Sequence, residues 1–489
     1  MNHHEKKGAE YRKTGEGDLV TRQERDSLGA REVPSEAYYG IQTLRAVENF
    51  PVSGRRERPE LISAYAILKM AAARANMELG ILDRQRGDAI VKAAEEILEG
   101  KFADQFPVDI FQAGAGTSFN MNVNEVIANR ALELLGMDRG QYDYLSPNDH
   151  VNLSQSTNDT FPTASHIAII RDAQRLDTVL EVLAATFRKK GTEFARLPKT
   201  GRTHLMDAIP VTLGDEFNAY SSAIIRAAGR IRERREGLLE VAIGGTATGT
   251  GANAPEGYRD AVLAELKILT GLRLVPARNS FEALQSRAQM AAFSGSLREL
   301  SLEIIRIAND LRLMSSGPTA GLDEIILPPV QPGSSIMPGK VNPVMAECAD
   351  MIAFQIIGND TVVSLAAQAG QFDLNVMTPA IVHNILDSIS LLTHYLPVFT
   401  DHCIDGIAAN EHRLLSTIGM NPILATMLAP KIGYLKAAEI AHESMVTHRH
   451  IRELAIEKGI LTKEEADEMF DLHTLARNQY RDGEEWNPV

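Results

Sequence analysis

A short stretch rich in glycine and proline carries the densest group of reactive side chains in the sequence. Residues 333–343 read Gly-Ser-Ser-Ile-Met-Pro-Gly-Lys-Val-Asn-Pro, and the glycines and prolines predict a loop. Two hydroxyls, an ammonium and an amide suit carboxylate binding and proton transfer, and they belong to Ser334, Ser335, Lys340 and Asn342. A surface loop with incidental serines is equally compatible with the composition.

The spacing within the same stretch disfavours a phosphate-binding loop. Such a loop has four residues between its two glycines and a hydroxyl residue directly after its lysine. Here five residues separate Gly333 from Gly339, and Val341 follows Lys340. The hydroxyl that would bind magnesium is therefore missing, and the sequence does not predict phosphate binding.

Two further polar clusters precede helical patterns. Residues 114–125 are dense in hydroxyls and amides before the apolar run 126–135, and residues 147–159 lead into a helical pattern over 164–190. The first turn of a helix presents free N–H groups and the positive end of its dipole, which together attract a carboxylate. Plain N-capping would explain one or two of these polar residues but not a whole cluster.

Two more clusters allow more than one interpretation. Residues 199–204 end in His204 beside Thr203, and a histidine in this setting is about as often structural as catalytic. Residues 244–254 contain a loose dinucleotide-binding pattern, but no strand–helix–strand unit with a downstream acidic residue surrounds it. We therefore expect residues 244–254 to form a tight turn with closely packed backbone.

Length, charge and cysteine content limit the possible functions. A chain of 489 residues exceeds a usual single core, so we expect two or three subdomains. The net charge of −14 argues against a nucleic-acid surface, which needs a basic face. No long apolar run predicts a membrane span, and the polar N-terminus does not resemble a secretory signal. Cys348 and Cys403 suggest free thiols in a reducing compartment, so we expect a cytoplasmic protein.

The remaining sequence predicts a mainly helical protein. Residues 1–23 are expected to form a disordered extension, and the glycine and proline breaks in residues 25–59 predict loops and turns. From residue 61 onward, alanine, leucine, lysine and glutamate dominate segments that often end in glycine. Helices are expected at residues 61–79, 88–98, 126–135, 164–190 and 213–235.

Two longer helices are expected to lie at the centre of a multi-helix assembly. Apolar residues at alternating steps of three and four define a seam that is typical of packed helices, and they are Met290, Phe293, Leu297, Leu300, Ile304, Ile307, Leu311 and Met314. Residues 372–399 are nearly uncharged, which predicts burial on most faces, with Pro379 as a kink. From residue 410 onward the segments are shorter, and Thr462 is a predicted N-cap.

Taken together, the clusters resemble the aspartase/fumarase superfamily of homotetrameric lyases, from about residue 25 to residue 476. Residues 333–343 resemble the most specific motif of the superfamily, and Glu347 follows at the expected distance. The resemblance implies a mainly α, three-domain fold whose central long-helix bundle forms the tetramer core. The domains expected are an N-terminal helical domain at 24–155, the bundle at 156–409 and a small C-terminal helical domain at 410–489.

Within the superfamily, residues 38–50 and Thr157 resemble the aspartate ammonia-lyase branch, which releases ammonia from L-aspartate to give fumarate. Met206 and Thr378 differ from the residues common in that branch, which have Gln and Glu at these places. The alternatives are a class II fumarase, which adds water to fumarate, and a non-catalytic helical scaffold of the same fold.

The resemblance also implies a role for each site residue. Ser334 is expected to be the general base that removes the Cβ proton, giving an aci-carboxylate intermediate. The donors expected at that carboxylate are Thr117, Ser156, Thr157 and Ser335. Lys340, Asn342 and Thr203 are expected at the other carboxylate. Asn158 and His204 are expected to contact the amino group, with Glu347 supporting His204.

The resemblance implies a small dicarboxylate, L-aspartate or fumarate, as the substrate. Neither a metal nor another cofactor is expected, and neither nucleic acid nor a membrane is expected as a partner. Each active site of the homotetramer is expected to combine residues from three subunits.

Overall fold

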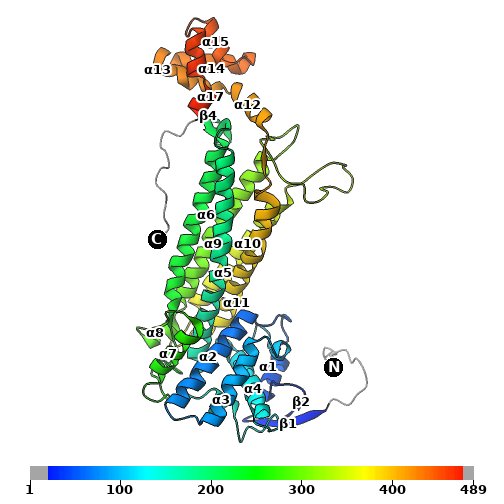
Figure 1. The fold of residues 1–489 in the computed structure, drawn as a ribbon, viewed down its shortest axis with the longest axis vertical. Helices are drawn as coiled ribbons and strands as arrows, with labels where there is room; N and C mark the ends of the chain where they lie inside the picture. Colours follow the sequence, from blue (N-terminus) through cyan, green and yellow to red (C-terminus); the bar gives the residue numbers. More distant parts are fainter. Residues whose placement is uncertain (1–19, 477–489) are drawn as a thin grey trace, which may run out of the picture. The chain divides into compact units, whose positions relative to one another are not determined.

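Residues 20–476 are described by a computed structural model, and they form a mainly helical protein, as predicted (Figure 1). The chain divides into two compact units, each formed by three separate segments. Unit 1 lies within residues 1–169, 238–288 and 365–383, and unit 2 lies within residues 170–237, 289–364 and 384–489. The three-domain boundaries expected from the resemblance stay a prediction.

Unit 1 is built around three helices that lie side by side (Figure 1), α2 (Pro59–Glu78), α3 (Arg84–Leu98) and α4 (Thr117–Leu134). Pro59 opens α2 at a position where its missing N–H group costs nothing, and Asp83 caps α3 by accepting the N–H of Arg86. The other named elements of unit 1 are β1 (Thr21–Asp26), β2 (Gly29–Pro34), α1 (Ile41–Asn49), β5 (Glu240–Val241), α7 (Tyr258–Thr270), β6 (Val275–Pro276) and α8 (Ser280–Gln285).

An aromatic cluster fills the centre of unit 1. Tyr65 of α2 is fully buried, and its ring centroid lies 5.3 Å from that of Phe119 and 5.9 Å from that of Phe161. Gly116, with a φ of 80°, precedes α4 at a point where a Cβ atom would lie 2.0 Å from the Phe161 ring. Only glycine therefore allows this turn to approach the cluster.

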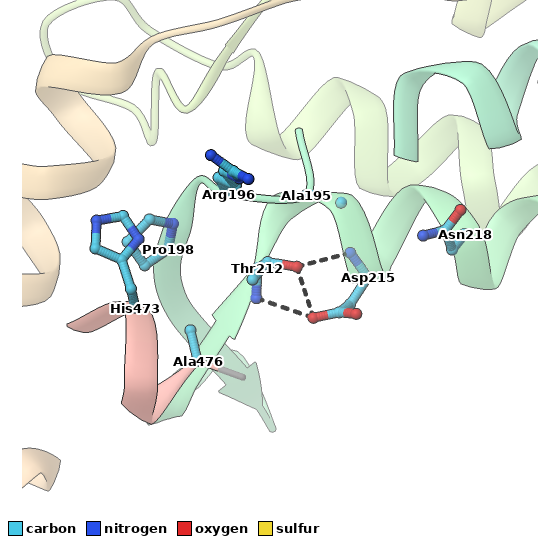
Figure 2. Close-up of a pocket in the computed structure, with 9 residues that line it drawn as sticks. Ala195, Arg196, Pro198, Thr212, Asp215, Asn218, His473 and Ala476 are labelled. Atoms are coloured by element: carbon cyan, nitrogen blue, oxygen red, sulfur yellow. Dashed lines mark hydrogen bonds between the residues drawn. The ribbon is translucent and has the colours of Figure 1, made fainter. Parts of the chain in front are cut away.

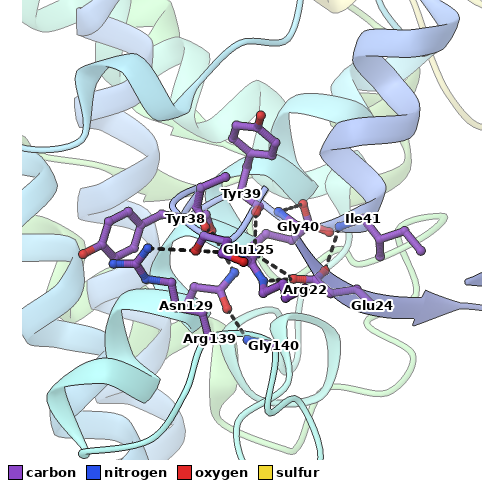
Figure 3. Close-up of polar contacts among 12 residues, drawn as sticks. Arg22, Glu24, Tyr38, Tyr39, Gly40, Ile41, Glu125, Asn129, Arg139 and Gly140 are labelled. Carbon is purple, nitrogen blue, oxygen red and sulfur yellow. Dashed lines mark hydrogen bonds and ion pairs between the residues drawn. The ribbon is translucent and has the colours of Figure 1, made fainter. Parts of the chain in front are cut away.

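Helix α1 begins on two buried carboxylates, as Figure 3 shows. Glu125 of α4 accepts the backbone N–H groups of Gly40, Gln42 and Thr43, at distances from 2.8 to 3.1 Å. Glu24 of β1 accepts the N–H of Ile41 at 2.8 Å. These acceptors occupy the N–H groups that a helix start leaves unpaired, where negative charge is also favoured by the helix dipole.

Five long helices have most of their residues in unit 2 (Figure 1), and they are α5 (Thr157–Glu193), α6 (Leu213–Glu236), α9 (Ala288–Met314), α10 (Val344–Gln368) and α11 (Thr378–Phe399). Side-chain contacts join neighbours: Arg235 of α6 pairs with Asp177 of α5 at 2.6 Å, and Tyr220 of α6 donates to Asp310 of α9 at 3.1 Å. Ser294 of α9 donates to Asp360 of α10 at 2.7 Å. The unit is therefore a helical bundle.

The predicted seam on α9 is confirmed. Its eight apolar residues are all buried, and the most exposed of them, Met314, retains only 5% of its accessible surface. A stripe at steps of three and four lies on one side of an α-helix. This regularity explains why the seam could be recognised from the sequence.

Shorter elements complete unit 2. They are β3 (Pro198–Thr203), β4 (Met206–Thr212), β7 (Ile325–Ile326), β8 (Ala408–Ala409), α12 (Glu411–Gly419), α13 (Ala429–Ile432), α14 (Tyr434–Thr447), α15 (Ile451–Glu457), α16 (Lys463–Met469) and α17 (Leu472–Leu475). Thr462 caps α16, as predicted, and exchanges reciprocal hydrogen bonds with Glu465. This exchange is a capping box.

Several expectations about local structure were wrong. Residues 25–59 contain α1 and most of the hairpin β1–β2 rather than only loops and turns. Residues 199–204 belong largely to strand β3, which was not predicted. Pro379 does not kink α11, because the helix starts at Thr378 and the proline occupies its first turn. Of the extension expected at residues 1–23, residues 1–19 lie outside the described residues, while residues 21–23 belong to β1.

Among residues 20–476, every helix is either too short or too polar to cross a membrane.

Candidate active site

Residues 333–343, here called the signature loop, contain neither helix nor strand, as predicted. The Gly333 N–H donates to the Lys340 carbonyl at 2.8 Å, and the Asn342 Nδ2 donates to the Gly333 carbonyl at 2.7 Å. A Cβ atom at position 333 would lie 2.6 Å from the Lys340 carbonyl oxygen, so only glycine allows this approach. The loop is therefore a ring closed by its own hydrogen bonds.

Ser334 accepts two backbone N–H groups inside this ring. Its Oγ lies 3.2 Å from the nitrogen of Ile336 and 3.0 Å from that of Met337. Hydrogen bonds to an oxygen favour its negatively charged form, so this arrangement suits a serine that must lose its proton. The Lys340 side chain on the same loop is exposed.

His204 lies at the tip of the hairpin β3–β4 in unit 2. Thr203 pairs with Met206, so His204 and Leu205 alone form the turn, with φ angles of 57° and 61°. Positive φ angles match a two-residue turn to the twist of its strands, but residues other than glycine adopt them at a cost. Such strain is concentrated at functional sites, and His204 is exposed at this tip.

A buried network of charges fixes the base of the same hairpin. Arg202 of β3 forms two hydrogen bonds with the Glu324 carboxylate, at 2.7 and 3.0 Å. Lys199, also on β3, lies 3.0 Å from Glu324 and 2.8 Å from Glu216. Glu324 directly precedes β7, which leads toward the signature loop. One carboxylate therefore anchors both the His204 hairpin and the start of the segment that carries Ser334.

Thr117 is the first residue of α4 in unit 1, and its side chain is exposed. Ala115 and Gly116 before it adopt left-handed angles, which turn the chain into the helix. A cavity of about 560 Å³ lies beside Thr117 and is also lined by Gln42 of α1 and by Asn148. Thr117 therefore faces a space that is large enough for a small ligand.

Ser156, Thr157 and Asn158 form the turn into α5. The Ser156 Oγ accepts the N–H of Asn158 at 3.2 Å, and the Asp159 carboxylate accepts the N–H of Ser156 at 3.0 Å. The Asp159 contact is one half of a capping box, and the Ser156 oxygen caps the second N–H group of the helix rather than the third. The three polar side chains are thus held at a helix N-terminus, as the sequence predicted.

Asp159 also ties this turn to the glycine-rich segment 244–254. Its second carboxylate oxygen accepts the N–H groups of Gly244 at 3.0 Å and Thr246 at 2.9 Å, and the Asn158 Nδ2 donates to the Ala247 carbonyl at 2.8 Å. Segment 244–254 is a series of turns with close backbone packing, as predicted. Its polar backbone holds the Ser156–Asn158 turn.

Burial raises the pKa of Asp159 to about 7, against the opposing effect of the N–H groups of Thr246, Ser156 and Gly244. Sequence analysis assigned no role to Asp159, although the spacing from Ser156 to Asp159 is that of a capping box and would have indicated its function.

The pocket in Figure 2 is not the candidate site. It measures about 200 Å³, lies in unit 2 and is lined by none of the predicted site residues. One side of it is the capping box of α6, in which Thr212 and Asp215 hydrogen-bond each other. These groups are therefore already paired.

The predicted site residues divide between the two units. Thr117, Ser156, Thr157 and Asn158 stand at helix starts in unit 1. Unit 2 carries the residues of the hairpin tip and the signature loop, which are Thr203, His204, Ser334, Ser335, Lys340 and Asn342, together with Glu347 in the first turn of α10. In the described range, no three His, Cys, Asp or Glu side chains gather as a metal site would require.

Residues 29–358 match the family described as lyase, and residues 424–477 match the family described as the C-terminus of fumarase C. The chain belongs to the aspartase/fumarase superfamily of lyases. The two matches together cover most of the chain, and they confirm the family that the polar clusters indicated.

The relatives of this chain include both aspartate ammonia-lyases and class II fumarate hydratases. An aspartate ammonia-lyase of Bacillus sp. is 49% identical over 92% of this chain and 97% of its own. A class II fumarate hydratase of Thermosynechococcus vestitus is 46% identical over 93% of this chain and 98% of its own. The crystal structure of a class II fumarase from Schistosoma mansoni matches with a TM-score of 0.89 and 37% identity, covering 94% of this chain and 99% of that one.

Thr378, one of the two positions that differ from the aspartase pattern, has a structural role. It is buried, and its Oγ1 accepts a hydrogen bond from the Arg287 Nε at 2.9 Å. Burial lowers the pKa of Arg287 to about 10. Met206, the other position, is 70% exposed beside the His204 turn, so it is the one of the two that adjoins a candidate site residue.

Proposed function

We propose that this superfamily member is an aspartate ammonia-lyase that converts L-aspartate to fumarate and ammonia. The observation that favours this reaction is the 49% identity to aspartate ammonia-lyases of two Bacillus sources. The fumarate hydratases follow at 45–46%. Hydration of fumarate is therefore the second candidate, and the same carboxylate sites would serve it.

Ser334 is the proposed general base. The Cβ proton of aspartate is weakly acidic, and its removal creates a dianionic carboxylate that the enzyme must bind more tightly than the substrate. A serine hydroxyl must first lose its own proton, and the N–H groups of Ile336 and Met337 on its Oγ support the charged form. Lys340 on the same loop would add a positive charge.

Two groups of donors hold the two ends of the substrate in this scheme. Charge develops on the Cβ carboxylate, which Thr117, Ser156, Thr157 and Ser335 would bind. Lys340, Asn342 and Thr203 would bind the other carboxylate. The helix starts at Thr117 and Thr157 add N–H groups and dipole charge at the end where the transition state gains charge.

Asn158 and His204 are proposed to contact the amino group. An ammonium donates hydrogen bonds and needs acceptors. The Asn158 Nδ2 already donates to the Ala247 carbonyl, which leaves its Oδ1 as the acceptor for the substrate. Glu347 would support His204.

The proposed enzyme is a homotetramer in which each active site combines residues from three subunits. One helix face supports an oligomer. Met351, Phe354, Val362 and Leu365 of α10 are 61%, 58%, 41% and 57% exposed. Steps of three and four through exposed Gly358 place them on one side of the helix. An apolar face of this length calls for a partner surface.

The reaction is tested by absorbance at the fumarate band with L-aspartate or L-malate as the only substrate, together with an ammonia assay. We expect absorbance to rise with aspartate and one ammonia to appear for each fumarate. Turnover of malate without turnover of aspartate would assign the chain to the fumarases instead.

The base is tested by Ser334→Ala. We expect turnover to fall at least ~10³-fold with the fold intact, because no other group in the signature loop would take the proton. Ser416→Ala, at an exposed serine of α12, is the matched control and should keep full activity. Full activity of Ser334→Ala would refute the assignment while leaving the fold unaffected.

A further inference from the structure

A chain of hydrogen bonds between buried and half-buried side chains adjoins Thr157 in unit 1. The Asn120 Nδ2 of α4 donates to the Thr157 Oγ1 at 2.9 Å and also faces the Asn152 Oδ1 at 3.3 Å. The Lys69 ammonium of α2 donates to the same Asn152 oxygen at 2.9 Å and to the Gln155 Oε1 at 2.9 Å. These contacts form a relay from Lys69 to Thr157.

Which group donates and which accepts is fixed at each hydrogen bond of the relay. An ammonium has donors and no acceptor, so Lys69 requires the oxygens of Asn152 and Gln155. The Asn152 Nδ2 in turn donates to the Gln155 carbonyl at 3.2 Å. Asn120 must then present its amide nitrogen to Asn152, because its oxygen would face another acceptor there.

The orientation of Asn120 determines the hydrogen bond of Thr157. The Asn120 nitrogen is a donor only, so the Thr157 oxygen accepts and the hydroxyl proton must point elsewhere. Asn120 is 1% exposed, and its Oδ1 has no hydrogen-bond partner. The described residues thus provide contacts for the amide nitrogen and none for the amide oxygen, which fixes the nitrogen as the atom that faces Thr157.

Lys69 places a buried amine at the far end of the relay. Its side chain is fully buried, and the two acceptors of its Nζ are the neutral amide oxygens of Asn152 and Gln155. Burial lowers the pKa of Lys69 to about 7, while the charge of Asp159 opposes this shift. The Tyr65 ring, 5.9 Å from the Nζ, is the other titratable group beside it. With a pKa near 7 the amine exchanges between neutral and charged forms, and negative charge that develops nearby favours the charged form.

We propose that Asn120 is a positioning residue that holds the Thr157 hydroxyl as a hydrogen-bond donor to the substrate carboxylate, and that the Lys69 charge supports the dianion formed there. This inference rests on the proposed role of Thr157. It adds two buried residues that do not touch the substrate in this scheme. Their contribution is to the transition state, in which the carboxylate gains charge.

The Asn120 half is tested by a double-mutant cycle with Thr157→Val. We expect Thr157→Val to lower kcat ~10²-fold, as for the loss of one transition-state donor. Asn120→Asp, which has nearly the same shape but an acceptor in place of the donor, should lower kcat to a similar degree with KM changed less than ~3-fold. In the Thr157→Val background, Asn120→Asp should have at most a ~3-fold further effect.

Asn120→Leu separates hydrogen-bond direction from the added charge. The leucine removes the donor without adding a carboxylate. The Thr157 hydroxyl is then no longer oriented toward the substrate, so kcat should fall ~10-fold. Multiplicative losses in the double mutants, or unchanged kcat in both Asn120 variants, would overturn the proposed role. If Asn120→Asp does not fold, the Asn120→Leu cycle gives the same decision.

The proposed role of the Lys69 charge is tested by measuring the affinity of two ligands. The nitronate of 3-nitropropionate carries the extra charge of an aci-carboxylate, whereas succinate resembles the ground state. Lys69→Met should weaken nitronate binding at least ~10-fold and succinate binding less than ~3-fold. Lys190→Met, at another buried lysine that lies in unit 2, is the control and should change neither. Equal loss for both ligands in Lys69→Met would show a structural role only.

Failure of the proposed function is distinguishable from failure of this inference. A wild-type enzyme that turns over malate but not aspartate would refute the aspartase assignment. The same cycle would then be measured with malate, because both reactions form the same kind of dianion. The inference fails only through the variants, whichever diacid the wild-type protein uses.

Discussion

Glu57 and Asp109 are two buried acids of unit 1 with opposite pKa shifts. Burial raises the pKa of Glu57 to about 8, and the charge of Asp109 adds to this effect. Burial also acts on Asp109, but the N–H groups of Phe111, Ser53 and Gly54 hold its pKa below the usual value. Glu57 therefore remains protonated at neutral pH, next to an ionised neighbour.

Glu57→Gln should become more stable than the wild-type protein as the pH rises. The unfolded Glu57 loses its proton near pH 4.5 and the folded one near pH 8, so wild-type stability falls between these values. The glutamine side chain is neutral over the whole pH range. Its oxygen can still accept a hydrogen bond from the Gln112 Nε2, which lies 3.0 Å from the Glu57 carboxylate.

The measurement is the midpoint of thermal unfolding at pH 5, 6.5 and 8. The difference in favour of Glu57→Gln should grow by several degrees over this range. Glu78→Gln, at an exposed position on α2, should show no such trend. A difference that does not change with pH would contradict the predicted shift.

Gly40 is needed for a steric reason at the start of α1. A Cβ atom there would lie 2.6 Å from a Glu24 oxygen and 2.6 Å from the Tyr142 hydroxyl. Gly40→Ala should therefore destabilise unit 1 by about 1–3 kcal/mol, as overpacking does. Gly229→Ala, in open space within α6, should be neutral or stabilising in the same urea titration.

At the scale of elements, regular patterns were predictable and isolated contacts were not. The α9 seam repeats over the whole helix, and the stripe alone identified its buried side. Helix α1 has only nine residues, and it depends on Glu24 and Glu125, which are distant in sequence. Hairpin β3–β4 likewise depends on Glu324 rather than on alternating apolar residues.

Glu324→Gln should destabilise the hairpin strongly. The substitution leaves Lys199 and Arg202 in a buried site with less negative charge, and breaking such a network costs about 3–5 kcal/mol. Glu299→Gln, which breaks the exposed pair with Arg230, should cost less than about 1 kcal/mol. Equal midpoints of the two variants in urea unfolding would show that the buried network contributes little.

At the scale of the whole molecule, the sequence predicted the helical class and the family, because five separate polar clusters together resemble one superfamily. It did not predict the composition of the two units, since each unit combines three separate chain segments. For the site, the sequence indicated the reactive side chains, such as Ser334. The groups that orient them, such as Asp159 and Asn120, became visible only through contacts.

The exposed apolar face of α10 predicts that activity requires association. Met351→Glu combined with Phe354→Glu places two charges on that face and should shift the proposed tetramer toward monomer in sedimentation velocity. Specific activity should fall at least ~10-fold, because charged groups disfavour a desolvated contact. Ile268→Glu, at a single exposed apolar residue of α7, should remain associated and active. A fully active monomer would rule out shared active sites.

The closed ring of the signature loop has a consequence for the cost of catalysis. Its internal hydrogen bonds, from Gly333 to Lys340 and from Asn342 to Gly333, restrict the conformational freedom of the segment before any ligand arrives. An unstructured loop of this length would lose that entropy each time it gripped a substrate. Here the hydrogen bonds of the ring form during folding, so the segment has less entropy left to lose when a ligand binds.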